Sequence, residues 1–176
     1  MKTISRSIML LIIACIIAGA FGVMHDQITY SISEEYYTKF KFIQFMIPPA
    51  LQNRIGVSIV GISATWWMGF IIGVIIIPFS YKCASKEYCN TAAIKSFAIV
   101  AITTSIVSIS AMVWGFLFSE KTTYYFEIPN DIVMSKEFYI VGNMHNFSYL
   151  GGLIGLLVAI AYLLNLLRLR TLKNKS

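Results

Sequence analysis

The sequence predicts an all-α, polytopic membrane protein with four transmembrane helices, and three observations support this prediction. First, four long apolar stretches, at about residues 7–24, 55–79, 96–118 and 147–167, contain no Asp, Glu, Lys, Arg or His. Each reaches or approaches the ~20 residues that a helix needs to cross ~30 Å of hydrocarbon. Second, only 12% of the 176 residues are charged, whereas a soluble domain carries about 25%. Third, the basic residues are unevenly distributed between the segments that join these stretches.

The first stretch follows a short basic segment, as in a signal peptide, and Ala18-Gly-Ala20 has the small residues of a cleavage site. The apolar run continues beyond that site to Val23, which favours an uncleaved first helix. With the other three stretches it forms one integral membrane domain over residues 1–176. Long loops at about 25–54 and 119–146 then lie on one side of the membrane.

The charges predict which side this is. The two tails and the loop between the second and third stretches hold nine basic residues and one acidic residue, whereas the two long loops hold five basic and seven acidic residues. Because Lys and Arg collect on the cytoplasmic side, both termini are expected in the cytoplasm. The basic C-terminal tail suits anionic lipid head groups. The net charge of +6 therefore requires no nucleic acid as a partner, and the lipid bilayer is the expected one.

Small residues recur at intervals of four in the stretches. Gly69 and Gly73 lie in the second stretch, and Gly151 and Gly155 lie in the fourth. Helices in lipid associate through such small residues, which allow their backbones to approach closely. These glycines are therefore expected to pack the helices of one chain together, or to join copies in a homo-oligomer.

Trp66 and Trp67 lie near the middle of the second stretch, although Trp prefers the interface between membrane and water. A central pair is expected to face the bundle core or to form a cavity wall, together with Tyr149, for a flat apolar ligand such as a quinone or a lipid tail.

Both histidines fall at the same predicted depth, because His25 ends the first stretch and His145 begins the fourth. Asp26 and Glu35 lie close to His25 in the sequence. These side chains could bind a divalent metal, act as a proton or ligand site, or simply end their helices. A methionine precedes each histidine, which would suit a soft ion such as copper.

The first long loop contains two local signals. Ile28, Tyr30 and Ile32 alternate with polar residues, a pattern that favours a short strand. Ser33, followed by two glutamates, is expected to cap a short helix. In the second loop, Asn130 and Asp131 are expected to begin a helix. The many aromatic residues of both loops predict either a cover over the outer surface of the bundle or a surface that binds a partner.

Four motifs occur in order along the chain: His25-Asp26-Gln27-x-Thr29, Glu35-Tyr36-Tyr37-Thr38, Ala64-Thr65-Trp66-Trp67-x-Gly69 and His145-x-x-Ser148-Tyr149-x-Gly151-Gly152. In these motifs the chain resembles a family of small, uncharacterised bacterial four-helix integral membrane proteins, and the resemblance covers most of its length. It implies a location in the bacterial inner membrane. It also implies that His25, Asp26, Glu35 and His145 belong to one site, but it implies no activity.

Three functions are compatible with the sequence. The first is binding or transport of a cation or small ligand at the outer face. The second is an enzyme that uses a His/carboxylate pair as general base. The third is a structural or accessory subunit that binds another membrane protein. No nucleophile motif, phosphate loop or zinc-protease signature is present, which counts against an enzyme. The spans carry no ionisable group at the midplane, where ion-coupled transporters usually hold one.

Overall fold

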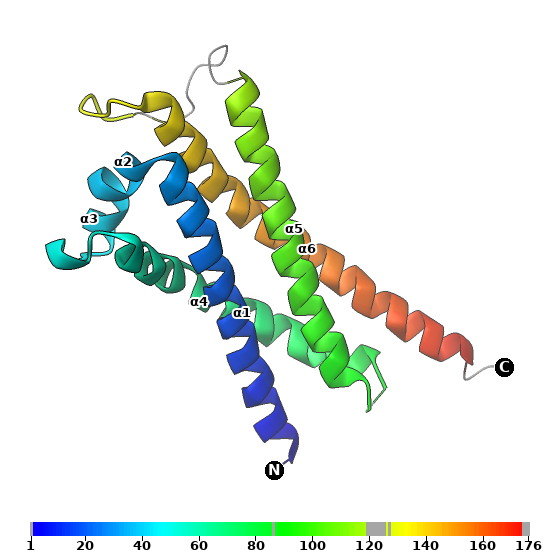
Figure 1. Ribbon diagram of the computed structural model, residues 1–176. Coiled ribbons are helices and arrows are strands. Elements are labelled where there is room, and N and C mark those ends of the chain that lie inside the picture. Colours follow the sequence, from blue (N-terminus) through cyan, green and yellow to red (C-terminus); the bar gives the residue numbers. More distant parts are fainter. Residues whose placement is uncertain (1, 86, 119–125, 127, 174–176) are drawn as a thin grey trace.

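The computed structural model describes residues 2–85, 87–118, 126 and 128–173, and in these residues it is all-helical. Four helices are long and apolar enough to cross a membrane, and they form a four-helix bundle (Figure 1). They are α1 (Lys2–Ile32), α4 (Arg54–Cys83), α5 (Cys89–Phe118) and α6 (Ser135–Lys173). The chain is therefore a multi-pass membrane protein, as the sequence predicts.

Short helical elements connect α1 to α4: α2 (Glu34–Tyr36), the π-helical turn η1 (Tyr37–Lys41), α3 (Phe42–Gln44) and the 3-10 turn η2 (Pro49–Leu51). They lie at one end of the bundle, which we call the loop end. Both chain termini lie at the other end, which we call the termini end (Figure 1). We call residues 33–44, which include α2, η1 and α3, the covering segment.

The long helices extend beyond the predicted spans at the loop end. α1 continues to Ile32, so the strand predicted around Tyr30 is instead the last turn of a helix. The helix continues because the polar residues in its final turns have partners inside the protein: Thr29 bonds to Tyr37 at 2.6 Å, and the Ser33 N–H donates to the Thr29 carbonyl. Ser33 caps α2 as expected, and its side chain accepts a bond from the Tyr36 N–H.

α6 begins at Ser135 rather than at Asn130–Asp131, which belong to a turn in which the Ile132 N–H bonds to Pro129. The two connections at the loop end are therefore shorter than the predicted loops 25–54 and 119–146. The aromatic residues Tyr124 and Tyr125 of the second loop lie outside the described residues.

The bundle consists of two helix pairs, α1 with α4 and α5 with α6, which make most of the contacts between elements. Glycines bring the backbones together within each pair. A Cβ atom on Gly69 would lie 2.5 Å from the Ala14 carbonyl oxygen, and one on Gly61 would lie 2.6 Å from Gly22. The Thr65 hydroxyl, which shares this interface, donates to the carbonyl oxygens of Ala18 and Gly61 at 2.8 and 2.7 Å.

The α5/α6 pair is built in the same way. A Cβ atom on Gly151 or Gly155 would lie 2.9 Å from the Cα of Thr104 or Val100, respectively. Gly73 completes the set, because a Cβ there would lie 2.7 Å from Leu11. The four glycines singled out in the sequence are therefore occupied by contacts within one chain, rather than left on a surface that could join two copies.

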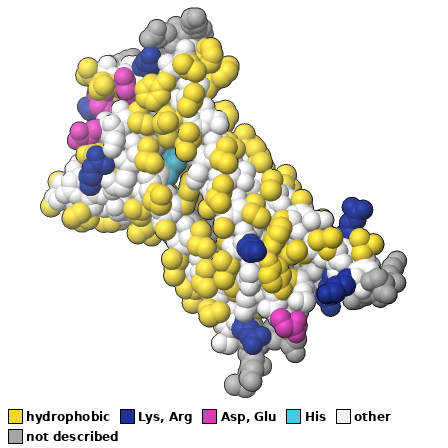
Figure 2. Space-filling model, turned by 45° about the vertical axis from the view of Figure 1, so that its right-hand side comes forward, with side chains coloured by type: hydrophobic (Ala, Val, Ile, Leu, Met, Phe, Trp, Pro, Cys, Tyr) yellow, Lys and Arg dark blue, Asp and Glu magenta, His cyan; other side chains and the backbone are white. Residues whose placement is uncertain are grey.

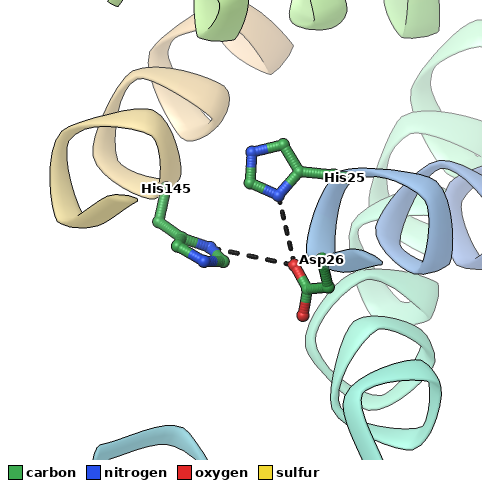
Figure 3. A group of neighbouring side chains, drawn as sticks. All are labelled: His25, Asp26 and His145. Carbon is green, nitrogen blue, oxygen red and sulfur yellow. Dashed lines mark hydrogen bonds and ion pairs between the residues drawn. The ribbon is translucent and has the colours of Figure 1, made fainter. Parts of the chain in front are cut away.

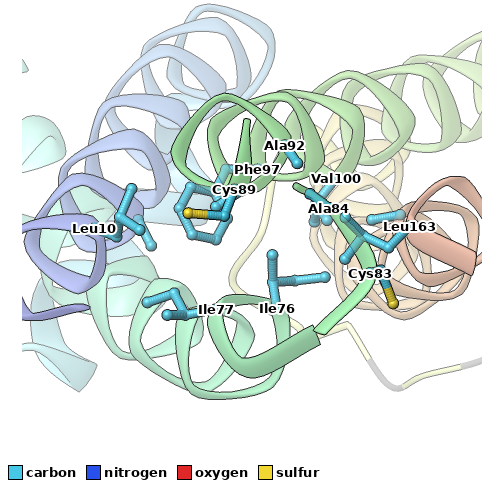
Figure 4. Close-up of a cluster of buried hydrophobic side chains, with 13 residues drawn as sticks. Leu10, Ile76, Ile77, Cys83, Ala84, Cys89, Ala92, Phe97, Val100 and Leu163 are labelled. Atoms are coloured by element: carbon cyan, nitrogen blue, oxygen red, sulfur yellow. The ribbon is translucent and has the colours of Figure 1, made fainter. Parts of the chain in front are cut away.

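Two hydrophobic clusters hold the pairs to each other. The larger lies towards the termini end and includes Leu10, Ile76, Phe97 and Leu163, one from each long helix (Figure 4). The smaller lies at the loop end, where the covering segment packs on α4 and α6 through Tyr37, Phe42, Val57 and Val141, among others. The polar site described below lies between the two clusters.

We predict that Gly69→Leu will separate α1 from α4 and lower the free energy of unfolding by about 1–3 kcal/mol or more, because the added side chain must displace backbone atoms. Unfolding of the purified protein by SDS, followed by circular dichroism, measures this. Gly19→Leu is the matched control, because a Cβ at Gly19 meets its nearest neighbour, Ile62, only at 3.9 Å. Equal stability of the two variants would contradict the prediction.

Candidate functional site

A polar cluster is buried where the two helix pairs meet near the loop end. α1 contributes His25 and Asp26, and α6 contributes His145 (Figure 3). On α1, the buried residues Gly22, His25, Asp26 and Thr29 recur at intervals of three and four, so they share the helix face that points into the bundle. Only 8% of His25, 3% of Asp26 and 9% of His145 is exposed. We call these three residues the His–Asp–His cluster.

The polar atoms of the cluster converge. His25 Nδ1 lies 3.1 Å from Asp26 Oδ1, and His145 Nδ1 lies 4.0 Å from the same oxygen. Each of the three residues offers one ligand atom, and these atoms all lie within 4.8 Å of one another. The two imidazole rings meet edge to face, with centroids 4.8 Å apart.

Ser108 of α5 connects the cluster to the second helix pair. Its hydroxyl lies 3.0 Å from His25 Nε2 and donates to the Met144 carbonyl of α6 at 3.2 Å. A serine hydroxyl carries a single hydrogen. If that hydrogen is given to Met144, His25 must donate its Nε2–H to Ser108. The Nδ1 of a neutral His25 then presents a lone pair, not a proton, to the Asp26 carboxylate.

Two buried atoms of the cluster have no hydrogen-bond partner among the described residues. They are Asp26 Oδ2 and His145 Nε2. Most buried polar side-chain atoms in proteins are hydrogen-bonded, and each exception calls for an explanation such as a water or an ion. The atoms that converge are Asp26 Oδ1 and the Nδ1 atoms of the two histidines, whereas the unpartnered oxygen and nitrogen are the other polar atoms of Asp26 and His145.

The covering segment closes the cluster on the loop side. The Tyr36 ring stacks on His145, with centroids 5.1 Å apart and planes 10° from parallel. Tyr37 is fully buried, and its hydroxyl donates to the Asp26 backbone carbonyl at 3.1 Å. These contacts hold the last turns of α1 and the turn of α6 that carries His145 in place around the cluster.

The same segment brings a buried lysine near the site. Lys41 is 7% exposed, its Nζ donates to Gln44 Oε1 at 3.1 Å, and Nζ lies 5.8 Å from the Tyr36 ring centroid. Burial lowers the pKa of Lys41, and the Asp26 carboxylate partly opposes this. Burial, followed by the charge of Asp26 and the Tyr149 phenol, raises the pKa of Tyr36.

Glu35 does not belong to the cluster, contrary to the expectation from the sequence. Its two carboxylate oxygens accept bonds from the backbone N–H groups of Val133 and Met134, at 3.1 and 2.8 Å. These residues lie directly before α6, so Glu35 fastens the covering segment to the start of that helix. Every residue except proline has a backbone N–H group. The identities of Val133 and Met134 therefore gave no sign that they bind Glu35.

The tryptophan pair also departs from the expectation. Trp66 and Trp67 are 50% and 41% exposed and so do not belong to the bundle core. The helix face that carries Gly61, Gly69 and Gly73 is the one packed on α1. Trp66 instead borders an apolar groove on the outside of the α1/α4 pair. Tyr149, in contrast, does line a cavity inside the bundle.

The methionines give no support for a copper site. Met24 is 67% exposed, so it lies on the outside of α1, away from the buried cluster. Met144 is buried, and the contact it offers to this network is its backbone carbonyl, which accepts from Ser108.

Sequence reasoning missed three residues of the site: Ser108, Tyr36 and Lys41. Ser108 is one of several hydroxyl residues in the third stretch, and Tyr36 belongs to the Glu35-Tyr36-Tyr37-Thr38 motif, but neither was assigned to the site. Each gains its role from the element packed against it.

Comparison of the chain with models of protein families, with curated proteins and with solved structures gives no match. The fold and the site are therefore the basis of the functional argument.

We predict that Glu35→Ala will speed hydrogen exchange at the Val133 and Met134 amides by roughly tenfold or more, because bonds to charged acceptors contribute about 1.5–3 kcal/mol. Exchange followed by mass spectrometry measures this. Glu34→Ala is the matched control, because among the described residues its side chain accepts from the Tyr30 hydroxyl and from no amide before α6. Unchanged protection in Glu35→Ala would refute the fastening role.

Proposed function

We propose that the protein is an integral membrane protein that binds a divalent transition-metal ion through His25, Asp26 and His145. The observation that carries this proposal is the convergence of three metal-ligand side chains in one buried place, with one ligand atom of each within 4.8 Å of the others. Two further atoms of these side chains, Asp26 Oδ2 and His145 Nε2, have no partner among the described residues. A bound cation would neutralise the buried carboxylate.

The distances suit a metal after a small adjustment. Two ligands of a tetrahedral zinc ion lie about 3.3 Å apart, given zinc–nitrogen and zinc–oxygen bonds of about 2.0–2.2 Å. His25 Nδ1 and Asp26 Oδ1 are 3.1 Å apart, and His145 Nδ1 and Asp26 Oδ1 are 4.0 Å apart. Closing the second separation requires a movement of less than about 1 Å, and the widest separation among the three ligand atoms, up to 4.8 Å, requires about 1.5 Å.

The ligand types favour zinc, iron(II) or a similar ion over copper(I). Two imidazoles and one carboxylate are nitrogen and oxygen ligands, whereas copper(I) selects soft thiolates and thioethers. The chain has cysteines at positions 15, 83 and 89, none of them in the metal-ligand group. Three protein ligands leave one position on a tetrahedral ion open, as in catalytic rather than structural zinc sites.

The residues around the cluster suit a metal site as well. A metal-ligating histidine usually donates its other ring N–H to an oxygen, which fixes the orientation of the ring. Ser108 would accept that bond from His25 Nε2. Tyr36, stacked on His145, would fix the second imidazole and limit the access of water.

We further propose that the membrane is a bacterial inner membrane, with both termini in the cytoplasm and the loop end outside. The distribution of Lys and Arg supports this orientation. The metal site would then lie at the outer end of the bundle. Binding is favoured over transport through the bundle, because the spans offer no further ionisable group towards the other side.

For the topology, we predict that a membrane-impermeant maleimide will label Ala50→Cys in intact cells, but Thr171→Cys only after the inner membrane is permeabilised. Both positions are exposed, one at the loop end and one near the C-terminus. The native cysteines are half-buried or buried. Their labelling in the unsubstituted protein gives the background level of maleimide labelling. The reverse labelling pattern would show that the orientation is inverted.

For the metal, we predict about one divalent ion per chain in protein purified without chelator, and less than about a tenth of that in His25→Ala, Asp26→Ala and His145→Ala, because each removes one of only three ligands. Inductively coupled plasma mass spectrometry measures the content. Ser108→Ala should weaken zinc binding by roughly 10–100-fold, the usual cost of losing an outer-shell partner.

Glu35→Ala serves as the matched control for these variants, since its carboxylate bonds to backbone amides outside the cluster, and it should keep its metal. Absence of metal in the unsubstituted protein, including after incubation with Zn²⁺, would refute the proposed function. A metal content in the three ligand variants equal to that of the unsubstituted protein would refute the assigned ligands.

A further inference from the structure

A groove of about 500 Å³ lies along the α5/α6 pair, in the half of these helices nearer the loop end. We call it the α5/α6 groove. α5 lines it with Ala111 and Trp114, among others, and α6 lines it with Asn143, Phe147 and Leu150. The lining is largely apolar and carries no charged side chain. Sites for small molecules typically enclose about 300–1,000 Å³, so the groove has the size and the lining of a site for a largely apolar molecule.

The groove lies between two close contacts of α5 with α6. A Cβ atom on Gly115 would lie 2.8 Å from Ile140 Cγ1, and one on Gly151 would lie 2.9 Å from a backbone atom of α5. Between these contacts α5 has the small side chain of Ala111, which leaves space beside Asn143. The same close packing that joins the two helices therefore also forms the ends of the groove.

Asn143 is a polar side chain without a partner in this groove. It is 8% exposed, and its amide makes no hydrogen bond with any described residue. Its nitrogen and oxygen are not fully enclosed, unlike the unpartnered atoms of Asp26 and His145, so a molecule in the groove can reach them. A buried amide without hydrogen bonds is costly, and it has both donors and an acceptor to satisfy. The groove therefore suits a molecule that both accepts and donates a hydrogen bond at this point.

The groove lies near the membrane interface at the loop end. On the face drawn in Figure 2, hydrophobic side chains extend along the middle of the molecule, and most of the Asp and Glu side chains lie at the loop end. Asn143 follows the acidic Glu137 by six residues of α6, which is about 9 Å of helix rise. Trp114 is 57% exposed, and Trp is enriched at the level of the head groups. A molecule in the groove would therefore place its polar group at Asn143 and its apolar part along Leu150, towards the midplane.

The chemistry of Asn143 and of the lining distinguishes between the molecules of a membrane. An ionised carboxylate at Asn143 would be costly, because the lining has no cation to pair with it. The ester groups of a two-chain glycerolipid only accept hydrogen bonds, so the Asn143 carbonyl would stay unpaired. A lysophospholipid, which has one chain, carries a free glycerol hydroxyl beside its ester carbonyl. That hydroxyl can donate to Asn143 Oδ1 while the ester carbonyl accepts from Nδ2–H.

We infer that the α5/α6 groove binds one lysophospholipid from the leaflet at the loop end, with its hydroxyl and ester at Asn143 and the first part of its chain along Phe147 and Leu150. The charged phosphate would lie beyond the groove, on the side of the head groups. This site is separate from the proposed metal site, because Asn143 and His145 are two residues apart on α6 and so lie on different faces of the helix.

The test uses Trp114, which lines the groove, as a fluorescent reporter. Trp66→Phe and Trp67→Phe together leave it as the one tryptophan of the full-length chain, which is reconstituted in vesicles of phosphatidylethanolamine and phosphatidylglycerol. Lysophosphatidylethanolamine with a brominated chain is then added, because bromine quenches indole fluorescence at close range. Half of the quenching is expected at a mole fraction about five- to tenfold lower than for brominated two-chain phosphatidylethanolamine, as one or two additional hydrogen bonds would give.

Asn143→Leu should abolish the preference for the lysophospholipid, because it removes the amide and keeps a side chain of similar size. Asn146→Leu is the matched control, because it makes the same substitution three residues further along α6, at an exposed position that does not line the groove. It should keep the preference. In the protein with Asn143 intact, a lysophospholipid whose glycerol hydroxyl is methylated should compete with the brominated lipid about five- to tenfold more weakly than the natural compound, because it cannot donate to Asn143.

Three results would overturn the inference. Equal quenching by the one-chain and two-chain lipids would show that the groove is covered by ordinary bilayer lipid. An unchanged preference in Asn143→Leu would remove Asn143 from the site. If that variant does not fold, the competition experiment decides: equal competition by the natural and the methylated lysophospholipid would overturn recognition of the hydroxyl. None of these measurements depends on zinc, so the inference and the proposed metal site can fail separately.

Discussion

Close contact between helix backbones at glycine is the interaction on which the rest of this structure depends. Lipid tails are as apolar as Leu, so a membrane supplies no hydrophobic force that would drive one helix onto another. Contact at short range must do so instead, and it requires the absence of side chains at Gly61 and Gly69 in one pair and at Gly151 in the other. Because these contacts fix the rotation of each helix, they also decide which residues face inwards, including His25 and His145.

The two pairs are joined near the loop end by a polar connection that passes from His25 through Ser108 to the Met144 carbonyl. In a low-dielectric interior such bonds are strong, and a polar group without a partner is costly for the same reason. The connection therefore stabilises the bundle, while the unpartnered atoms of Asp26 and His145 oppose it. A cation at this place would turn the costly part of the cluster into a further link between the pairs, so metal binding and the association of the pairs should be coupled.

Much of the fold could be predicted from the sequence, because the cost of charge in hydrocarbon marks the four spans. The shared depth of His25 and His145 followed from the same pattern. What could not be predicted is what each side chain meets. Glu35 accepts hydrogen bonds from backbone amides, and the residue types in a sequence do not indicate such a partner. Trp66 lies on the outer surface of the bundle, because the face of α4 that carries the glycines packs on α1. Ser108 looked like any hydroxyl of its span until α6 was placed beside it.

The position of the site between a closed covering segment and an apolar cavity bears on the kind of ligand it can receive. A water-soluble ligand would have to displace Tyr36 from His145 and release the bonds that Glu35 makes at the start of α6. Exclusion of water also strengthens every attraction between charges at the site, because charges interact more strongly in a low dielectric. The arrangement that hides the site from water is thus the one that would let it hold a cation against the Asp26 carboxylate.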